Sequence, residues 1–126
     1  MLILVVDDSM VARNILKNVL EPMGHEVIEA SNGREALKIL EKLAKEVGCV
    51  LLDWNMPVMN GFETLQAIRS DKDCGHILIL MVSTESEDEF IERAIAAGAN
   101  GYLAKPFSAE ELKAKMADIL KAAKPR

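Results

Sequence analysis

The chain has 126 residues, of which 50% are hydrophobic, so it can form one ordinary core but not two, and we expect a single domain over residues 1–126. Its formal net charge of -5 argues against a nucleic-acid partner, because proteins that bind the phosphate backbone usually carry a basic patch. No apolar run approaches the roughly 20 residues of a membrane span, and the N-terminus lacks signal-peptide features, so membrane insertion is not expected.

Apolar runs alternate with amphipathic stretches, a pattern typical of βα units on a mostly parallel sheet. The apolar runs predict strands at Leu2–Val6, Glu26–Ala30, Val50–Asp53, Ile77–Val82 and Tyr102–Ala104. A helix is predicted after each strand, with apolar residues at helical spacing. Glycine stops are expected at Gly24, Gly48 and Gly98, and capping pairs at Asn32 with Glu35, Ser86 with Glu89 and Ser108 with Glu111. The tail at residues 121–126 is predicted to fray.

The polar side chains that can carry chemistry follow four of the five predicted strands, because the second strand is followed only by Ser31 and Asn32. The four groups are Asp7 and Asp8 after the first strand, Asp53 and Asn55 after the third, Ser83, Thr84 and Glu85 after the fourth, and Lys105 after the fifth. In an open parallel sheet, ligands bind outside the carboxyl ends of the strands. The sequence therefore predicts that three carboxylates, a hydroxyl and an ammonium converge at one edge of the sheet.

Three carboxylates at one edge repel one another and raise each other's pKa unless a cation lies between them. Lys105 supplies only one positive charge, so we expect a divalent ion, and oxygen ligands favour Mg²⁺. The absence of His and Cys from these strand ends argues against zinc. Asp53 could then act as a nucleophile toward phosphorus, with the metal and Lys105 neutralising the phosphoryl oxygens and Ser83 donating a hydrogen bond.

Simpler interpretations stay open for single residues. Asp7 and Asp8 could merely open the first helix, where Asp is favoured. Trp54 could pack in the core or lie on the rim of the site. Arg13 and Arg69 are most simply solvated surface charges. The two isolated cysteines lack metal-ligand spacing and are typical of free thiols in a reducing cytosol, so we expect a cytoplasmic protein.

Four motifs together resemble the receiver domain of bacterial two-component response regulators, over the whole chain. They are VVDD at Val5–Asp8, DWNMPVMNG at Asp53–Gly61, MVST at Met81–Thr84 and YLAKPF at Tyr102–Phe107. Each motif alone is weak, but all four occur in order at the expected strand ends. The resemblance implies an α/β fold: a single-domain, doubly wound, five-stranded parallel sheet of order 2-1-3-4-5, the flavodoxin-like order.

The resemblance also implies roles for the residues at the strand ends. Asp53 matches the phosphoacceptor, and Asp7 and Asp8 match the acidic pair that holds Mg²⁺. Asn55 matches the position whose backbone carbonyl completes the metal ligands. Lys105 matches the lysine that contacts the phosphate.

A second group of positions matches the family's switch. Ser83 matches the switch hydroxyl, Tyr102 the aromatic residue whose rotamer follows the switch, and Pro106 the proline commonly preceded by a cis peptide. Within the family, the chain is most similar to the stand-alone chemotaxis type. The features that carry this similarity are Trp54, Asn55, Glu85 and the lack of an output domain. Thr84 departs from the family's usual Ala or Gly, and its bulk is expected to slow turnover of the acyl phosphate.

By resemblance, the chain is a signalling protein and not an enzyme, except toward its own phosphorylation and dephosphorylation. The implied partners are a histidine kinase, an output protein on the face of the fourth helix, fifth strand and fifth helix, and a phosphatase. A phosphorelay intermediate is an alternative. A Mg²⁺-dependent phosphohydrolase would normally need a carboxylate where the chain has Asn55, and an FMN carrier would need a hydroxyl-rich loop where it has Asp7 and Asp8.

Overall fold

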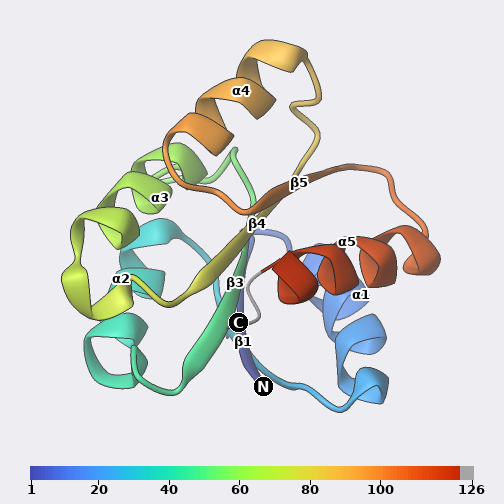
Figure 1. Ribbon diagram of the computed structural model, residues 1–126, viewed down its shortest axis with the longest axis horizontal. Coiled ribbons are helices and arrows are strands. Elements are labelled where there is room, and N and C mark those ends of the chain that lie inside the picture. The colour runs from blue at the N-terminus through green and yellow to red at the C-terminus, as the bar shows by residue number, and fades with distance from the viewer. Residues whose placement is uncertain (123–126) are drawn as a thin grey trace.

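Five parallel strands form one sheet in the order β2-β1-β3-β4-β5 in the computed structural model, which describes residues 1–122 (Figure 1). The strands are β1 (Leu2–Val6), β2 (Glu26–Ala30), β3 (Val47–Leu52), β4 (Leu78–Ser83) and β5 (Gly101–Ala104). The helices are α1 (Met10–Leu20), α2 (Gly33–Leu43), α3 (Gly61–Ser70), α4 (Asp88–Ala96) and α5 (Ala109–Ala122). Short 3₁₀ turns follow α1 at Glu21–Met23 and α3 at Lys72–Cys74. The predicted fold class and strand order are confirmed.

Helices cover both faces of the sheet, as the nearly continuous apolar strands require. Helices α1 and α5 pack on one face, where Leu16, Leu20, Leu112 and Met116 meet the strands. Helices α2, α3 and α4 cover the other face (Figure 1). No helix within residues 1–122 has the length and apolar character needed to cross a membrane.

The first helix ends earlier than its apolar spacing predicts. Pro22 has no N–H to continue the helical ladder, so the chain passes into a 3₁₀ turn after Leu20. Gly24 then ends the turn in the left-handed conformation, with φ 95°. The chain does turn at Gly24, but the glycine ends the short 3₁₀ turn, whereas α1 itself ends at Leu20.

Two predicted helix boundaries are wrong. Gly48 does not end a helix, because β3 begins at Val47 and Gly48 lies inside it, at an irregularity in the pairing with β1. Ser86 does not cap α4, which begins at Asp88 after Glu87 with no side-chain capping hydrogen bond. The pairs at Asn32 and Ser108 do cap their helices. The last four residues of the tail predicted to fray lie outside the described residues, whereas Lys121 and Ala122 continue α5.

Candidate phosphoryl and metal site

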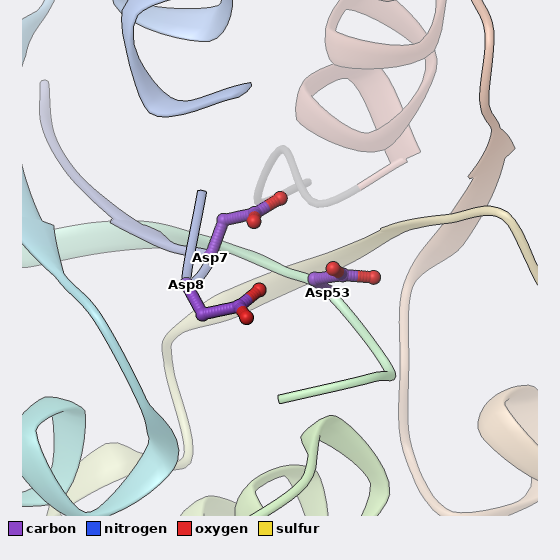
Figure 2. A group of neighbouring side chains, drawn as sticks. All are labelled: Asp7, Asp8 and Asp53. Carbon is purple, nitrogen blue, oxygen red and sulfur yellow. The ribbon is translucent and has the colours of Figure 1, made fainter. Parts of the chain in front are cut away.

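Three carboxylates meet at the carboxyl edge of the sheet. Asp7 and Asp8 follow β1, Asp53 follows β3, and one oxygen from each lies within 4.8 Å of the others (Figure 2). Asp7 and Asp53 are buried and Asp8 is exposed, so the cluster opens to solvent on the side of Asp8. The predicted convergence of these three residues is confirmed.

One ammonium group bridges two of the carboxylates. Lys105, just beyond β5, places its Nζ 2.7 Å from Asp7 Oδ2 and 3.5 Å from Asp53 Oδ2. A single positive charge therefore faces three negative ones. The fourth strand delivers Ser83 to the same edge, where it is fully buried.

Asp53 is held in an environment that disfavours its charged form. Burial raises the pKa of its carboxyl, opposed by Lys105, while the nearby Asp7 raises it further. Its Oδ1 atom is buried and has no hydrogen-bond partner among residues 1–122. An unpaired buried carboxylate oxygen is costly, so this atom is available to a cation or to an incoming electrophile.

The donor set fits Mg²⁺. Three carboxylates from two strand ends supply hard oxygen ligands on one open side of the site, which leaves room for water and phosphate oxygens. The unpartnered Asp53 oxygen and the excess of negative charge both favour a divalent cation there. The main-chain carbonyl of Asn55 remains a predicted further ligand.

One hydrogen-bonded network joins Asn55, Ser83, Glu85 and Tyr102. The Glu85 N–H donates to Ser83 Oγ at 3.2 Å, and the Asn55 side-chain amide donates to Glu85 Oε1 at 3.2 Å. The Tyr102 hydroxyl donates to the Glu85 main-chain carbonyl. The loop after β4 is therefore tied both to the loop after β3 and to β5, and a change at Ser83 has a direct path to buried Tyr102.

Residues 3–117 match the response regulator receiver domain family. The chain belongs to this family. Its relatives include a chemotaxis protein CheY homolog of Campylobacter jejuni, 43% identical over 121 residues that cover 95% of this chain and 92% of the relative. Chemotaxis protein CheY1 of Helicobacter pylori is 41% identical over 121 residues, covering 95% and 97%. The solved structure of chemotaxis response regulator CheY4 of Vibrio cholerae aligns with a TM-score of 0.86 and 37% identity, covering 94% of this chain and 97% of that one.

Receiver domains bind Mg²⁺ at an acidic pocket, and Asp7, Asp8 and Asp53 form such a pocket in this chain. Two of the residues predicted to modulate the site, Thr84 and Pro106, lie beside Lys105. Thr84 is exposed and lines, with Lys105, Pro106 and Phe107, a groove of about 350 Å³ against α1. The Lys105–Pro106 peptide is cis, as the resemblance implied.

Trp54 of this receiver is a packing residue and does not lie on the rim. Only 7% of it is exposed, and its ring stacks on Phe62 of α3, with centroids 5.1 Å apart, and meets Phe90 of α4 edge-on at 5.0 Å. The Arg93 guanidinium carbon lies 4.6 Å from the Phe62 ring centroid and 5.5 Å from that of Trp54. The residue next to Asp53 is thus in direct contact with α4.

The prediction that Arg13 and Arg69 are solvated surface charges is wrong. Arg13 donates to the Asp7 main-chain carbonyl and pairs with Glu29. Arg69 donates to the Gly98 carbonyl and to the Asn100 side chain. Neither residue carries a motif, because their acceptors are main-chain or side-chain oxygens that only the tertiary fold brings near.

Proposed function

We propose that this receiver accepts a phosphoryl group on Asp53 from a histidine kinase. A carboxylate oxygen of Asp53 attacks the phosphorus of a phosphohistidine, and the new O–P bond replaces the N–P bond, whose electron pair returns to the imidazole nitrogen. The observation that carries this proposal is the buried, unpartnered Oδ1 of Asp53, a member of the acidic cluster. A structural aspartate would instead have that oxygen hydrogen-bonded.

The surrounding residues then have distinct tasks. Asp7, Asp8, Asp53 and the Asn55 main-chain carbonyl would hold Mg²⁺, which when bound neutralises charge on the transferred phosphoryl group. Lys105, already within 3.5 Å of Asp53 Oδ2, contacts the phosphoryl oxygens once they arrive. Charge neutralisation by a fixed ammonium is the electrostatic contribution that phosphoryl transfer needs.

Phosphorylation is proposed to act on partners through the Ser83–Glu85–Tyr102 network. The Ser83 hydroxyl can donate to a phosphoryl oxygen while its Oγ accepts from the Glu85 N–H. When Ser83 turns toward the phosphoryl group, it draws on Glu85, whose main-chain carbonyl accepts from Tyr102. The surface biased by this change is formed by α4, β5 and α5, which we assign to an output protein. The names of the relatives point to chemotaxis or motility control; a phosphorelay intermediate is the alternative, and a phosphatase is an expected further partner.

An aspartyl-phosphate phosphohydrolase is the less favoured function. Such an enzyme would normally use a second carboxylate two residues beyond its nucleophile, and that position is Asn55, whose amide is bonded to Glu85. We therefore propose that the chain's only catalysis is its own phosphorylation and dephosphorylation. With both cysteines buried as free thiols, we expect it to act in the cytoplasm.

Incubation with acetyl phosphate and Mg²⁺ is expected to add the mass of one phosphoryl group to the native chain. Asp53→Asn, which keeps the shape of the side chain but removes the nucleophile, is expected to add none. A chelator should also prevent the gain. Intact-mass spectrometry measures all three samples, and an equal gain in Asp53→Asn would refute the assignment of the phosphoacceptor.

Thr84→Ala is expected to speed loss of the phosphoryl group by a few-fold. Thr84 is exposed beside Lys105, so its side chain limits the approach of water to the phosphorylated carboxylate. Thr84→Val keeps the bulk without the hydroxyl and serves as the control, with a rate close to that of the native chain. Phosphate release after removal of the donor gives the rate, and an unchanged rate in Thr84→Ala contradicts the steric role.

A further inference from the structure

Arg13 links three elements directly behind the acidic cluster. It lies on α1, and only 14% of its side chain is exposed. Its Nη1 donates to the main-chain carbonyl of Asp7 at 2.6 Å, and its Nε lies 2.9 Å from Glu29 Oε1 on β2. The ion pair with Glu29 orients the guanidinium, which leaves Nη1 directed at the end of β1.

The carbonyl that Arg13 binds belongs to the peptide that joins Asp7 to Asp8. A peptide group is planar and carries the Cα atoms of both residues, so a hydrogen bond to its oxygen also fixes the direction in which the second residue leaves the backbone. The other groups of Asp7 are already held: its N–H donates to the Ala30 carbonyl, and its carboxylate binds the Ser9 N–H and Lys105.

Asp8 has no such support of its own. Its carboxylate is exposed and accepts no hydrogen bond within residues 1–122, although it reaches into the cluster with Asp7 and Asp53 (Figure 2). Its direction is therefore set by the backbone that carries it. The Asp7–Asp8 peptide is the part of that backbone that Arg13 holds.

We propose that Arg13 is a positioning residue for the metal site: held by Glu29, it fixes the Asp7–Asp8 peptide and thereby orients the Asp8 carboxylate toward a bound Mg²⁺. This inference rests on the proposed Mg²⁺-dependent function and assigns Arg13 no contact with the ion. Partners that orient metal ligands are a general requirement of metal sites, and their loss typically weakens metal binding by about 10–100-fold.

Electrostatics and positioning predict opposite effects for the loss of this arginine. Arg13 carries a positive charge close to a site for a cation, so Coulomb repulsion alone would make Mg²⁺ bind more tightly when that charge is removed. Loss of a positioning hydrogen bond would make Mg²⁺ bind more weakly. The sign of the change therefore separates the two roles without any assay of phosphoryl transfer.

Arg69 offers a matched control at the opposite end of the sheet. It too is partly buried and donates to main-chain carbonyls, those of Gly98 at 2.9 Å and Cys74 at 3.4 Å. Its other partner, Asn100, accepts from the N–H of Ile79 near the start of β4. Its removal costs a comparable set of contacts far from the carboxylates.

The experiment is a calorimetric titration of Mg²⁺ into the native chain, Arg13→Ala, Arg13→Lys and Arg69→Ala, each with circular dichroism to measure its folded fraction. We expect Mg²⁺ affinity to fall about tenfold in Arg13→Ala. Arg13→Lys keeps the charge, but a lysine ammonium lacks the planar array of donors with which the guanidinium binds Glu29 and the Asp7 carbonyl together. The Mg²⁺ affinity of Arg13→Lys should therefore also fall. Arg69→Ala should be less stable yet keep native affinity.

The possible results separate the two levels of inference. Native or tighter Mg²⁺ binding in folded Arg13→Ala or Arg13→Lys, with normal binding in the native chain, overturns the positioning role alone. Equal weakening in Arg69→Ala also overturns it, because the effect would then reflect general stability. Failure of the native chain itself to bind Mg²⁺ overturns the proposed function and this inference with it.

Discussion

Replacing Gly61 with alanine is expected to destabilise the protein by about 3 kcal/mol or more and to prevent phosphorylation of Asp53. A Cβ at Gly61 would lie 1.9 Å from the main-chain oxygen of Asp53 and 2.8 Å from the Cα of Trp54. These are backbone atoms, which cannot rotate away as a flexible side chain can. The Gly61 N–H also donates to the Trp54 carbonyl at 2.8 Å, so α3 begins in direct contact with the segment that carries the nucleophile.

Urea unfolding combined with the acetyl phosphate assay measures both effects of Gly61→Ala. Gly75→Ala is the matched control, because Gly75 has right-handed helical angles and a Cβ there would meet nothing closer than the Lys72 carbonyl at 3.7 Å. That control should change stability by no more than about 0.5 kcal/mol. A Gly61→Ala protein with native stability would mean that the contact is relieved without displacing Asp53.

Periodicity was sufficient to predict the strands but not where neighbouring elements begin and end. The strand Leu2–Val6 could be recognised because both faces of β1 are covered, so its side chains form a continuous apolar run and do not alternate between apolar and polar. Gly48 was misassigned because glycine is a common helix stop, whereas here it lies at an irregularity where β3 pairs with β1. Pairing between distant segments decided that boundary, and it leaves no local signal.

The start of α4 shows how long-range contacts can override a capping pattern. Ser86 and Glu89 have the spacing of a capping box, but Glu85 just before them is held by Ser83, Asn55 and Tyr102. With the chain fixed at Glu85 by these contacts, the helix begins at Asp88, one residue later than the pattern predicts. The capping preference of Ser86 and Glu89 is present in the sequence, but the tertiary hydrogen bonds at Glu85 outweigh it.

The acidic cluster could be predicted because topology alone brings the ends of parallel strands together. To predict that Asp7, Asp8 and Asp53 meet, only the order of the strands was needed, without any knowledge of side-chain contacts. Arg13 could not be found in this way, since only the tertiary fold brings the carbonyl of Asp7 and the carboxylate of Glu29 to one guanidinium. The aromatic contacts of Trp54 with α4 depend likewise on tertiary packing.

Asp53→Asn is expected to raise the free energy of unfolding by about 1–3 kcal/mol at pH 7 in the absence of Mg²⁺. The substitution removes the charge of a buried carboxylate that lies beside Asp7 and has an unpartnered oxygen. The same substitution at exposed Asp118 on α5 is the control and should change stability by no more than about 0.5 kcal/mol. Urea unfolding from acid to neutral pH measures the difference.

The pH dependence of this gain follows from the raised pKa of Asp53, which burial causes. Well below the pKa of the unfolded chain the carboxyl is protonated in both states, so the native chain and Asp53→Asn should be similarly stable. As pH rises, the unfolded chain ionises first, and the native chain loses stability until the pH has passed the raised pKa of the folded state. The gain in Asp53→Asn should therefore develop over that interval and then level off.

Saturating Mg²⁺ should reduce the stability gain of Asp53→Asn, because the ion stabilises the site with three carboxylates more than the site that has lost one carboxylate. A constant difference at all pH values would mean that the ionisation of Asp53 does not limit stability.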